Sequence, residues 1–192
     1  TGLLGLLLLA REPSLTVTGL ELSPASCALA DRTAAANGLT DRLITLPCDL
    51  RDRRQLPSAG HFDLAVSNPP YFPAGGGKTA AGSRGIHRAE LACTMEQLCA
   101  AAAYLLRSGG QFCLVYRTER LAELMETLRR HRLEPKVLRF VQKNAASAPS
   151  LLLMACRKDG GTGLTVQPPL LLENDDGTET PELRRIYFKE KG

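Results

Sequence analysis

The sequence predicts an α/β fold in which helices flank a mostly parallel β-sheet. Short segments rich in β-branched and apolar residues alternate with segments of helical length, which is the pattern of a parallel sheet with helical crossovers. The 192 residues are 44% hydrophobic and 23% charged, as in a globular domain with one substantial core. Polar residues also follow three successive predicted strands, at the edge where parallel sheets bind ligands.

The first elements are two helices and two strands. Residues 3–11 form an apolar segment that predicts a buried helix, and residues 15–20 predict a strand. A second helix begins at Ser23-Pro24, since serine caps helices and proline suits the first helical position, and it ends at Asn37-Gly38. Residues 42–46 predict the next strand.

The middle of the chain continues the alternation. Residues 62–67 predict a strand, and a helix opens with the capping box Thr94–Gln97 and stops at residues 108–110, a Ser-Gly-Gly sequence. The remaining predicted elements are a strand at 111–116, an amphipathic helix at 119–131 and strands at 137–141 and 150–156. From residue 160 the sequence predicts a loop with a small hairpin around Asp176-Gly177.

Composition limits the classes of function. The six cysteines form no C-x-x-C pair and only three histidines accompany them, so we expect no metal site and a reducing, cytoplasmic location. The sequence shows no signal peptide and no uninterrupted apolar stretch of roughly 20 residues, so we expect no membrane span. The net charge of +4 permits nucleic-acid binding without requiring it.

The polar residues at the predicted strand ends are Glu21, Asp49 and the sequence Asn68-Pro69-Pro70-Tyr71. Asn-Pro-Pro-Tyr directly after an apolar strand resembles the catalytic motif of class I S-adenosylmethionine-dependent amino-methyltransferases. That resemblance covers residues 1 to about 158 and implies a Rossmann-like sandwich with an antiparallel last strand. It implies catalytic roles for Asn68, Pro69, Pro70 and Tyr71, and S-adenosylmethionine contacts from Thr1, Gly2, Glu21, Leu22, Asp49, Leu50 and Asn68. In the family, the first acid bonds the ribose and the second bonds the adenine amine.

A narrower resemblance points to the substrate. The sequences "NPPYF" and "CTMEQLCAAAAYLLRSGGQFCLVYRTERLAEL" look like bacterial tRNA adenine-N6-methyltransferases that modify valine tRNA. Many of these carry a histidine between an arginine and a glutamate, where this chain has Ala89 between Arg88 and Glu90. The resemblance implies tRNA as the partner and implies substrate contacts from Tyr71, Phe72, Lys78, Arg84 and Arg88.

The chemistry of amine methylation explains the motif. An amine conjugated to a purine is a poor nucleophile because its lone pair is delocalised into the ring. The Asn68 side-chain oxygen and the Pro69 carbonyl can accept its two N–H groups and restore that lone pair. Prolines fix φ and lack N–H groups, so the turn is rigid, and Tyr71 can stack on an extruded base.

The glycine-rich segment 74–88 has two possible functional interpretations. Gly77-Lys78-Thr79 is not a phosphate-binding P-loop, because Phe72 stands where that motif needs a glycine. Lys78, Arg84, Arg88 and His87 could meet RNA phosphates when the segment covers a polyanion. A surface loop with incidental charges explains the same residues.

The domain organisation and two alternatives complete the prediction. We expect a catalytic domain at residues 1–160 that lacks its N-terminal part, including the first strand of the sheet, and an extension of the same domain at 161–192. That strand would lie between strands 15–20 and 62–67, so these two should not pair directly. The alternatives are a protein glutamine-N5 methyltransferase, which uses the same motif on an amide, and a non-catalytic nucleic-acid-binding remnant. The sequence leaves the oligomeric state open.

Overall fold

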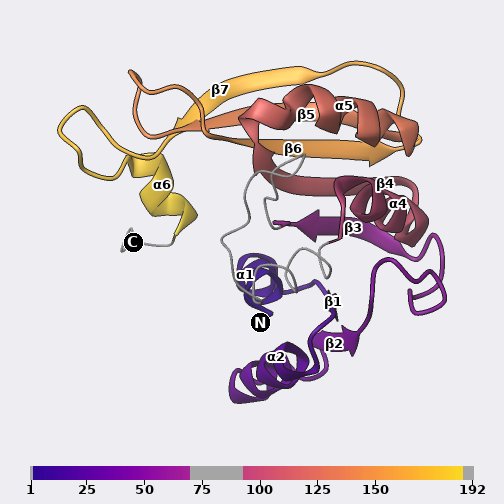
Figure 1. Cartoon of the computed structure of the whole chain (residues 1–192). Helices are drawn as coiled ribbons and strands as arrows, with labels where there is room; N and C mark the ends of the chain where they lie inside the picture. Colours follow the sequence, from indigo (N-terminus) through magenta and orange to yellow (C-terminus); the bar gives the residue numbers. More distant parts are fainter. Residues whose placement is uncertain (1, 70–92, 188–192) are drawn as a thin grey trace, which may run out of the picture. The chain divides into compact units, whose positions relative to one another are not determined.

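The computed structural model describes residues 2–69 and 93–187. The chain divides into two compact units, Thr1–Pro57 and Ser58–Gly192, and each unit contains its own sheet (Figure 1). The first unit has a two-stranded sheet and the second a five-stranded sheet.

The first unit follows the predicted order of elements. It contains α1 (Leu3–Arg11), β1 (Val17–Glu21), α2 (Pro24–Ala36) and β2 (Leu43–Pro47). β1 and β2 are parallel, with Val17 opposite Leu43 and Glu21 opposite Pro47. Because the strands are parallel and in this register, their carboxyl ends lie side by side.

Local sequence explains how α1 and α2 pack. Ser23 caps α2 by accepting the Ser26 N–H at 3.3 Å, as the sequence predicted. A Cβ at Gly5 would come within 2.9 Å of Leu43 Cδ1, so glycine lets α1 approach β2 closely. Leu9, Ala34 and Leu43 form the small core that α1, α2 and β2 share.

The expectation that α1 is buried was wrong for much of its surface. Leu3, Leu4 and Leu7 are each at least 41% exposed, whereas Gly5 and Leu9 are buried. An apolar composition predicted the helix correctly, but in the structure only the face that meets β1 and β2 is covered.

The second unit carries the larger sheet. Its elements are β3 (Phe62–Ser67), α4 (Met95–Leu105), β4 (Leu106–Arg117), the 3₁₀ turn η1 (Thr118–Arg120), α5 (Leu121–Arg130), β5 (Leu133–Gln142), β6 (Leu151–Lys158), β7 (Thr165–Leu171) and α6 (Pro181–Ile186). The strand order is β3-β4-β6-β5-β7. β6 runs antiparallel to both neighbours and the other four strands are mutually parallel, which confirms the predicted α/β class.

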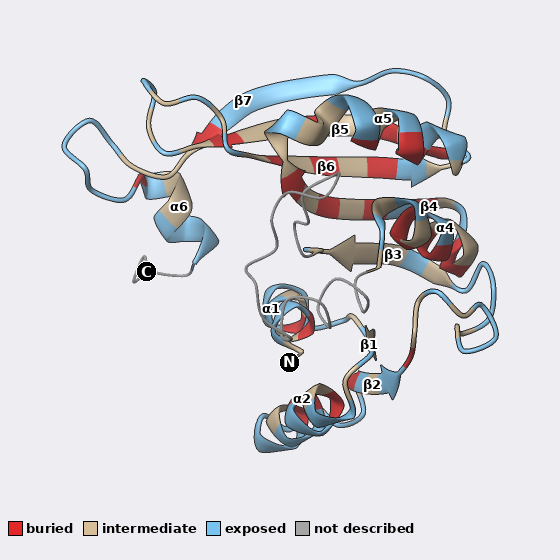
Figure 2. Cartoon of the chain, viewed as in Figure 1, coloured by how far each residue is buried: buried red, intermediate tan, exposed pale blue. Residues whose placement is uncertain are grey.

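Helices α4 and α5 contact each other and lie on the same face of this sheet (Figure 1). α4 begins with the predicted capping box, because Thr94 Oγ1 accepts the Gln97 N–H and Gln97 Oε1 accepts the Thr94 N–H. On β4 and β6 buried residues alternate with less buried ones, as Figure 2 shows. Phe112 and Leu152, with Leu124 of α5, are among the largest fully buried side chains of the core.

Three predictions in this unit were wrong. β5 begins at Leu133, four residues before the predicted start at residue 137, because Leu133 to Pro135 already pair with β6. β4 begins at Leu106, inside the segment expected to end a helix and stop at glycines, because Leu106 pairs with Phe62 and the ladder resumes at Gln111, opposite Leu64, after a register shift. β7 occupies a segment expected to be loop, and it pairs in parallel with β5. The sequence did not predict this strand because the segment contains Pro168 and Pro169 and its residues are mostly exposed. Prolines are tolerated here because β7 lies at the edge of the sheet.

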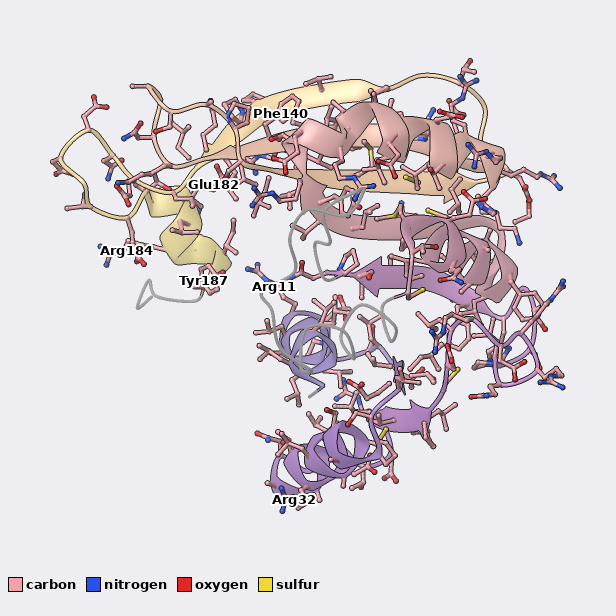
Figure 3. The ribbon with its side chains drawn as sticks, in the orientation of Figure 1. Arg11, Arg32, Phe140, Glu182, Arg184 and Tyr187 are labelled. Carbon is pink, nitrogen blue, oxygen red and sulfur yellow. The ribbon has the colours of Figure 1, made fainter. Side chains whose placement is uncertain are left out.

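The end of the described chain is tied to this sheet. The turn around Asp176-Gly177 closes with an antiparallel bridge between Glu173 and Glu179, which confirms the small hairpin. Helix α6 follows, and Figure 3 shows Glu182 and Arg184 on it and Tyr187 at its end. Two hydrogen bonds of 2.7 Å join Glu182 to Arg139 of β5.

β1 and β3 do not pair with each other within the described residues. β1 pairs with β2, and β3 pairs with β4.

Candidate functional site

Two of the predicted acids lie at the joined carboxyl ends of β1 and β2. Glu21 is the last residue of β1, and Asp49 lies two residues beyond the end of β2. The Cys48 N–H donates to the Glu21 carbonyl at 2.9 Å, so the pairing continues past the regular strands. The first unit therefore brings the two carboxylates to one edge, as the sequence predicted.

The Glu21 side chain is oriented by the start of α2. Its Oε1 accepts the Ser23 backbone N–H at 3.0 Å, and Ser23 is the residue that caps the helix. The Cys27 thiol donates to the Glu21 carbonyl at 3.6 Å. The strand end, the turn and the first turn of α2 thus hold this carboxylate in a defined place.

Asp49 is fixed more tightly, by Arg51. Asp49 Oδ1 accepts the Arg51 N–H and Nε–H, both at 2.9 Å, and Oδ2 accepts Nη2–H at 2.7 Å. These hydrogen bonds from Arg51 lower the pKa of the Asp49 carboxyl from its ordinary value. The group therefore carries its negative charge throughout the neutral range and is an acceptor.

Gln55 holds the main chain of the same loop. Its Oε1 accepts the Asp49 N–H at 3.0 Å, and its Nε2–H donates to Asp52 Oδ2 at 3.2 Å. The sequence reading missed both Arg51 and Gln55. The short D-x-R spacing was the available signal, because a side chain two residues on can reach back to an aspartate that accepts its backbone N–H.

Other predicted cofactor residues of the first unit flank these acids. Leu22 follows Glu21 and is 40% exposed, and Leu50 follows Asp49 and is partly buried. An exposed leucine beside a carboxylate can cover one face of a flat ring. Gly2 has φ 72° at the start of α1, a left-handed conformation that favours glycine, while Thr1 lies outside the described residues.

Asn68 and Pro69 directly follow β3 in the second unit. β3 ends at Ser67, which pairs with Leu114 of β4, and the Asn68 side chain is exposed at this carboxyl end. The predicted position of Asn68 and Pro69 at the carboxyl end of a strand is therefore confirmed. The predicted site residues Pro70, Tyr71, Phe72, Lys78, Arg84 and Arg88 lie outside the described residues.

The described groups can bind polar organic ligands through hydrogen bonds. Among residues 2–69 and 93–187, no group of three or more histidine, cysteine, aspartate or glutamate side chains is placed to hold a metal ion. No helix in the described part of the chain has the length and apolar character needed to cross a bilayer. The carboxylates of Glu21 and Asp49 can accept hydrogen bonds from hydroxyl or amine groups, and the Asn68 amide can both donate and accept.

Comparisons with known proteins give the family. Residues 1–141 match the family described as methyltransferase small domain. A tRNA1(Val) (adenine(37)-N6)-methyltransferase of Porphyromonas gingivalis strain W83 is 30% identical over 191 residues, which cover 97% of this chain and 74% of the relative. A protein of the same name from Dickeya chrysanthemi is 27% identical, over 92% of this chain and 71% of its own length. A release factor glutamine methyltransferase of Chlorobaculum tepidum is 29% identical over a smaller share, 67% of this chain and 46% of that protein.

Solved structures show the same fold at lower identity. A predicted O-methyltransferase from Agrobacterium tumefaciens matches with a TM-score of 0.79 at 21% identity, over 96% of this chain and 83% of that one. Geranyl diphosphate C-methyltransferase from Streptomyces coelicolor, solved with S-adenosyl-L-homocysteine, has a TM-score of 0.56 at 12% identity, over 82% and 67% of the two chains. The chain therefore belongs to the methyltransferase small domain family, in the group named tRNA1(Val) (adenine(37)-N6)-methyltransferases.

Proposed function

We propose that this chain transfers a methyl group from S-adenosylmethionine to the exocyclic N6 amine of an adenine in tRNA. The observation that carries the proposal is Asn68-Pro69 at the exposed carboxyl end of β3, in a chain of this family. The names of the relatives support adenine 37 of a valine tRNA as the target.

In this proposal Asn68 and Pro69 act on the amine. The Asn68 side-chain oxygen accepts one N–H, and the Pro69 backbone carbonyl accepts the other. These two acceptors would favour a tetrahedral nitrogen whose lone pair is available to the methyl carbon of the bound cofactor, with S-adenosylhomocysteine as the leaving group. The cofactor supplies the electrophilic methyl group. The methylated nitrogen is acidic enough to lose its proton without a tuned general base.

The residues of the first unit fit the cofactor's adenosine. Glu21 would accept the ribose hydroxyls, and Asp49, ionised because Arg51 lowers its pKa, would accept a hydrogen bond from the adenine amine. Leu22 and Leu50 each follow one of these acids and would cover the faces of the base. The donor and acceptor chemistry of this edge therefore suits the adenosine of S-adenosylmethionine, the cofactor of this family.

RNA contacts are proposed for the segment after Pro69. Tyr71 and Phe72 would stack on the extruded base, and Lys78, Arg84 and Arg88 would meet phosphates. We place the reaction in the cytoplasm, where tRNA is found. The cysteines are thiols rather than disulfides in the described part of the chain, which suits a reducing compartment.

A protein glutamine-N5 methyltransferase is the second candidate, because similarity to a release factor glutamine methyltransferase covers 67% of the chain. An amide nitrogen presents the same two N–H groups to Asn68 and Pro69. The tRNA-modifying relative matches over 97% of the chain, which favours RNA.

One assay separates the candidates. The purified chain is incubated with methyl-labelled S-adenosylmethionine and either unmodified total tRNA or a bacterial release factor. The proposal requires label in tRNA and not in the release factor. Label in the release factor alone would support the glutamine reaction. Label in neither, from a chain that still binds tRNA, would support a non-catalytic binding protein.

A further inference from the structure

We propose that Arg51 is a positioning residue that fixes the Asp49 carboxylate and leaves one acceptor position, on Oδ2, for the adenine amine of the cofactor. This inference rests on the proposed function, because it assigns a partner to Asp49. It adds a residue outside those that the sequence singled out.

The hydrogen bonds around Asp49 account for nearly all of its acceptor capacity. Each carboxylate oxygen can accept about two hydrogen bonds. Oδ1 accepts the backbone N–H and the Nε–H of Arg51, both at 2.9 Å. Oδ2 accepts Nη2–H at 2.7 Å and shares the same Nε–H at 3.0 Å. Since Nε lies slightly closer to Oδ1 than to Oδ2, the hydrogen bonds from the described residues leave one acceptor position on Oδ2.

Hydrogen bonds within the loop itself hold Asp49. Gln55 accepts the Asp49 N–H at 3.0 Å, and the Cys48 thiol donates to the Gln55 carbonyl at 3.5 Å. Arg51 and Asp49 have side chains that are 32% and 24% exposed, so the pair is partly shielded from water. Both the main chain and the side chain of Asp49 are therefore oriented in advance, which lowers the ordering cost of binding.

A single open acceptor on an ionised carboxylate selects for a hydrogen-bond donor. Adenine presents an N–H at its exocyclic position, whereas hypoxanthine presents a carbonyl oxygen there. A carbonyl facing Asp49 would find no hydrogen to share and would be repelled by the negative charge. Fixing the carboxylate should therefore increase discrimination between adenosine and inosine forms of the cofactor.

The same loop contains a matched control. Arg54 pairs with Asp52 in the same pattern, with its backbone N–H, Nε–H and Nη2–H donating at 2.9 to 3.1 Å. The Arg54 side chain is 89% exposed, and Asp52 is not one of the predicted cofactor residues. Since Arg54 donates to Asp52, its removal takes an ion pair from the same loop while the hydrogen bonds from Arg51 to Asp49 are retained.

The test is calorimetric binding of S-adenosylhomocysteine and of S-inosylhomocysteine to the full chain, with no turnover involved. For Arg51→Gln we expect about a tenfold loss of affinity for the adenosine ligand, on the scale of one charge-assisted hydrogen bond. The preference for adenosine over inosine should shrink at the same time. Arg51→Lys should recover part of both, and Arg54→Gln should match the wild type.

The remaining outcomes each overturn the inference. Unchanged or tighter binding by Arg51→Gln would mean that Arg51 does not position Asp49 or competes with the adenine. An equal loss in Arg54→Gln would mean that the loop needs both ion pairs only for its structure. Asp49→Asn tests the Asp49 carboxylate separately from Arg51. If Asp49→Asn weakens binding while Arg51→Gln does not, only the role of Arg51 fails. If wild type binds no S-adenosylhomocysteine, the proposed cofactor site fails as well.

Discussion

Glu21 and Asp49 differ in what holds them in place. Glu21 Oε1 accepts a backbone N–H from Ser23 at 3.0 Å. Both carboxylate oxygens of Asp49, in contrast, accept hydrogen bonds from the Arg51 guanidinium. Glutamine at position 21 keeps an oxygen for Ser23 but removes the charge. At the scale of single residues, charge and local geometry can therefore be tested separately.

We expect Glu21→Gln to weaken S-adenosylhomocysteine binding by about 10- to 100-fold, the range for hydrogen bonds to a charged group. tRNA binding, measured by filter retention, should stay within twofold. Glu12→Gln is the matched control, because Glu12 Oε1 accepts the Ser14 N–H at 3.1 Å in the same way. Equal affinity in Glu21→Gln and wild type would move the ribose contact to another residue.

Asn68→Ala should leave the fold intact and reduce the methylation rate by about 10²- to 10³-fold, as expected when a pre-organised polar contact to a transition state is lost. The side chain is exposed at the end of β3, so its removal opens no cavity in the core. Single-turnover kinetics on saturating tRNA give the rate, and circular dichroism reports the fold. Near-normal turnover would refute the catalytic role of Asn68.

At the scale of elements, the core of the second unit buries two thiols. Cys99 of α4 and Cys156 of β6 are almost fully buried. Burial raises the pKa of Cys99 from its ordinary 9.0 to about 12, and neighbouring negative charges add to the shift. Burial also raises the pKa of Cys156. Both thiols are therefore neutral packing groups at physiological pH.

This pKa shift predicts a loss of stability in alkali. Above about pH 9 the unfolded chain can release the Cys99 proton, while the folded chain retains it until about pH 12. The free energy of unfolding should therefore fall as the pH rises through this window. Urea titrations at pH 8, 9 and 10 should show a shallower fall for Cys99→Ala than for wild type. Parallel slopes would contradict the buried, protonated state of this thiol.

Elements with strong local signals were predicted well, and those defined by neighbours were not. Ser23 and Thr94 begin helices where their caps predict, and β3 has the predicted bounds. β7 was missed because its conformation depends on pairing with β5, and an exposed edge strand shows no apolar alternation. The start of β4 was missed for a similar reason, since the register with β3 determines it.

At the scale of the whole molecule, the family match at residues 1–141 extends across both compact units. The sequence identified Glu21, Asp49 and Asn68 because each comes directly or shortly after a predicted strand, and the structure places all three at carboxyl ends of strands or just beyond. It did not identify Arg51 and Gln55, which act through side-chain hydrogen bonds that strand patterns do not encode. The segment after Pro69 remains a prediction.

The most direct test of the proposed function is the position of the methyl group in the product. Unmodified valine tRNA is incubated with the chain and S-adenosylmethionine, digested to oligonucleotides and sequenced by mass spectrometry. The proposal predicts one added methyl group at adenine 37, recovered as N6-methyladenosine, and a rate of its formation about 10²- to 10³-fold lower with Asn68→Ala. A methyl group on another base, or on a ring nitrogen of adenine, would contradict it.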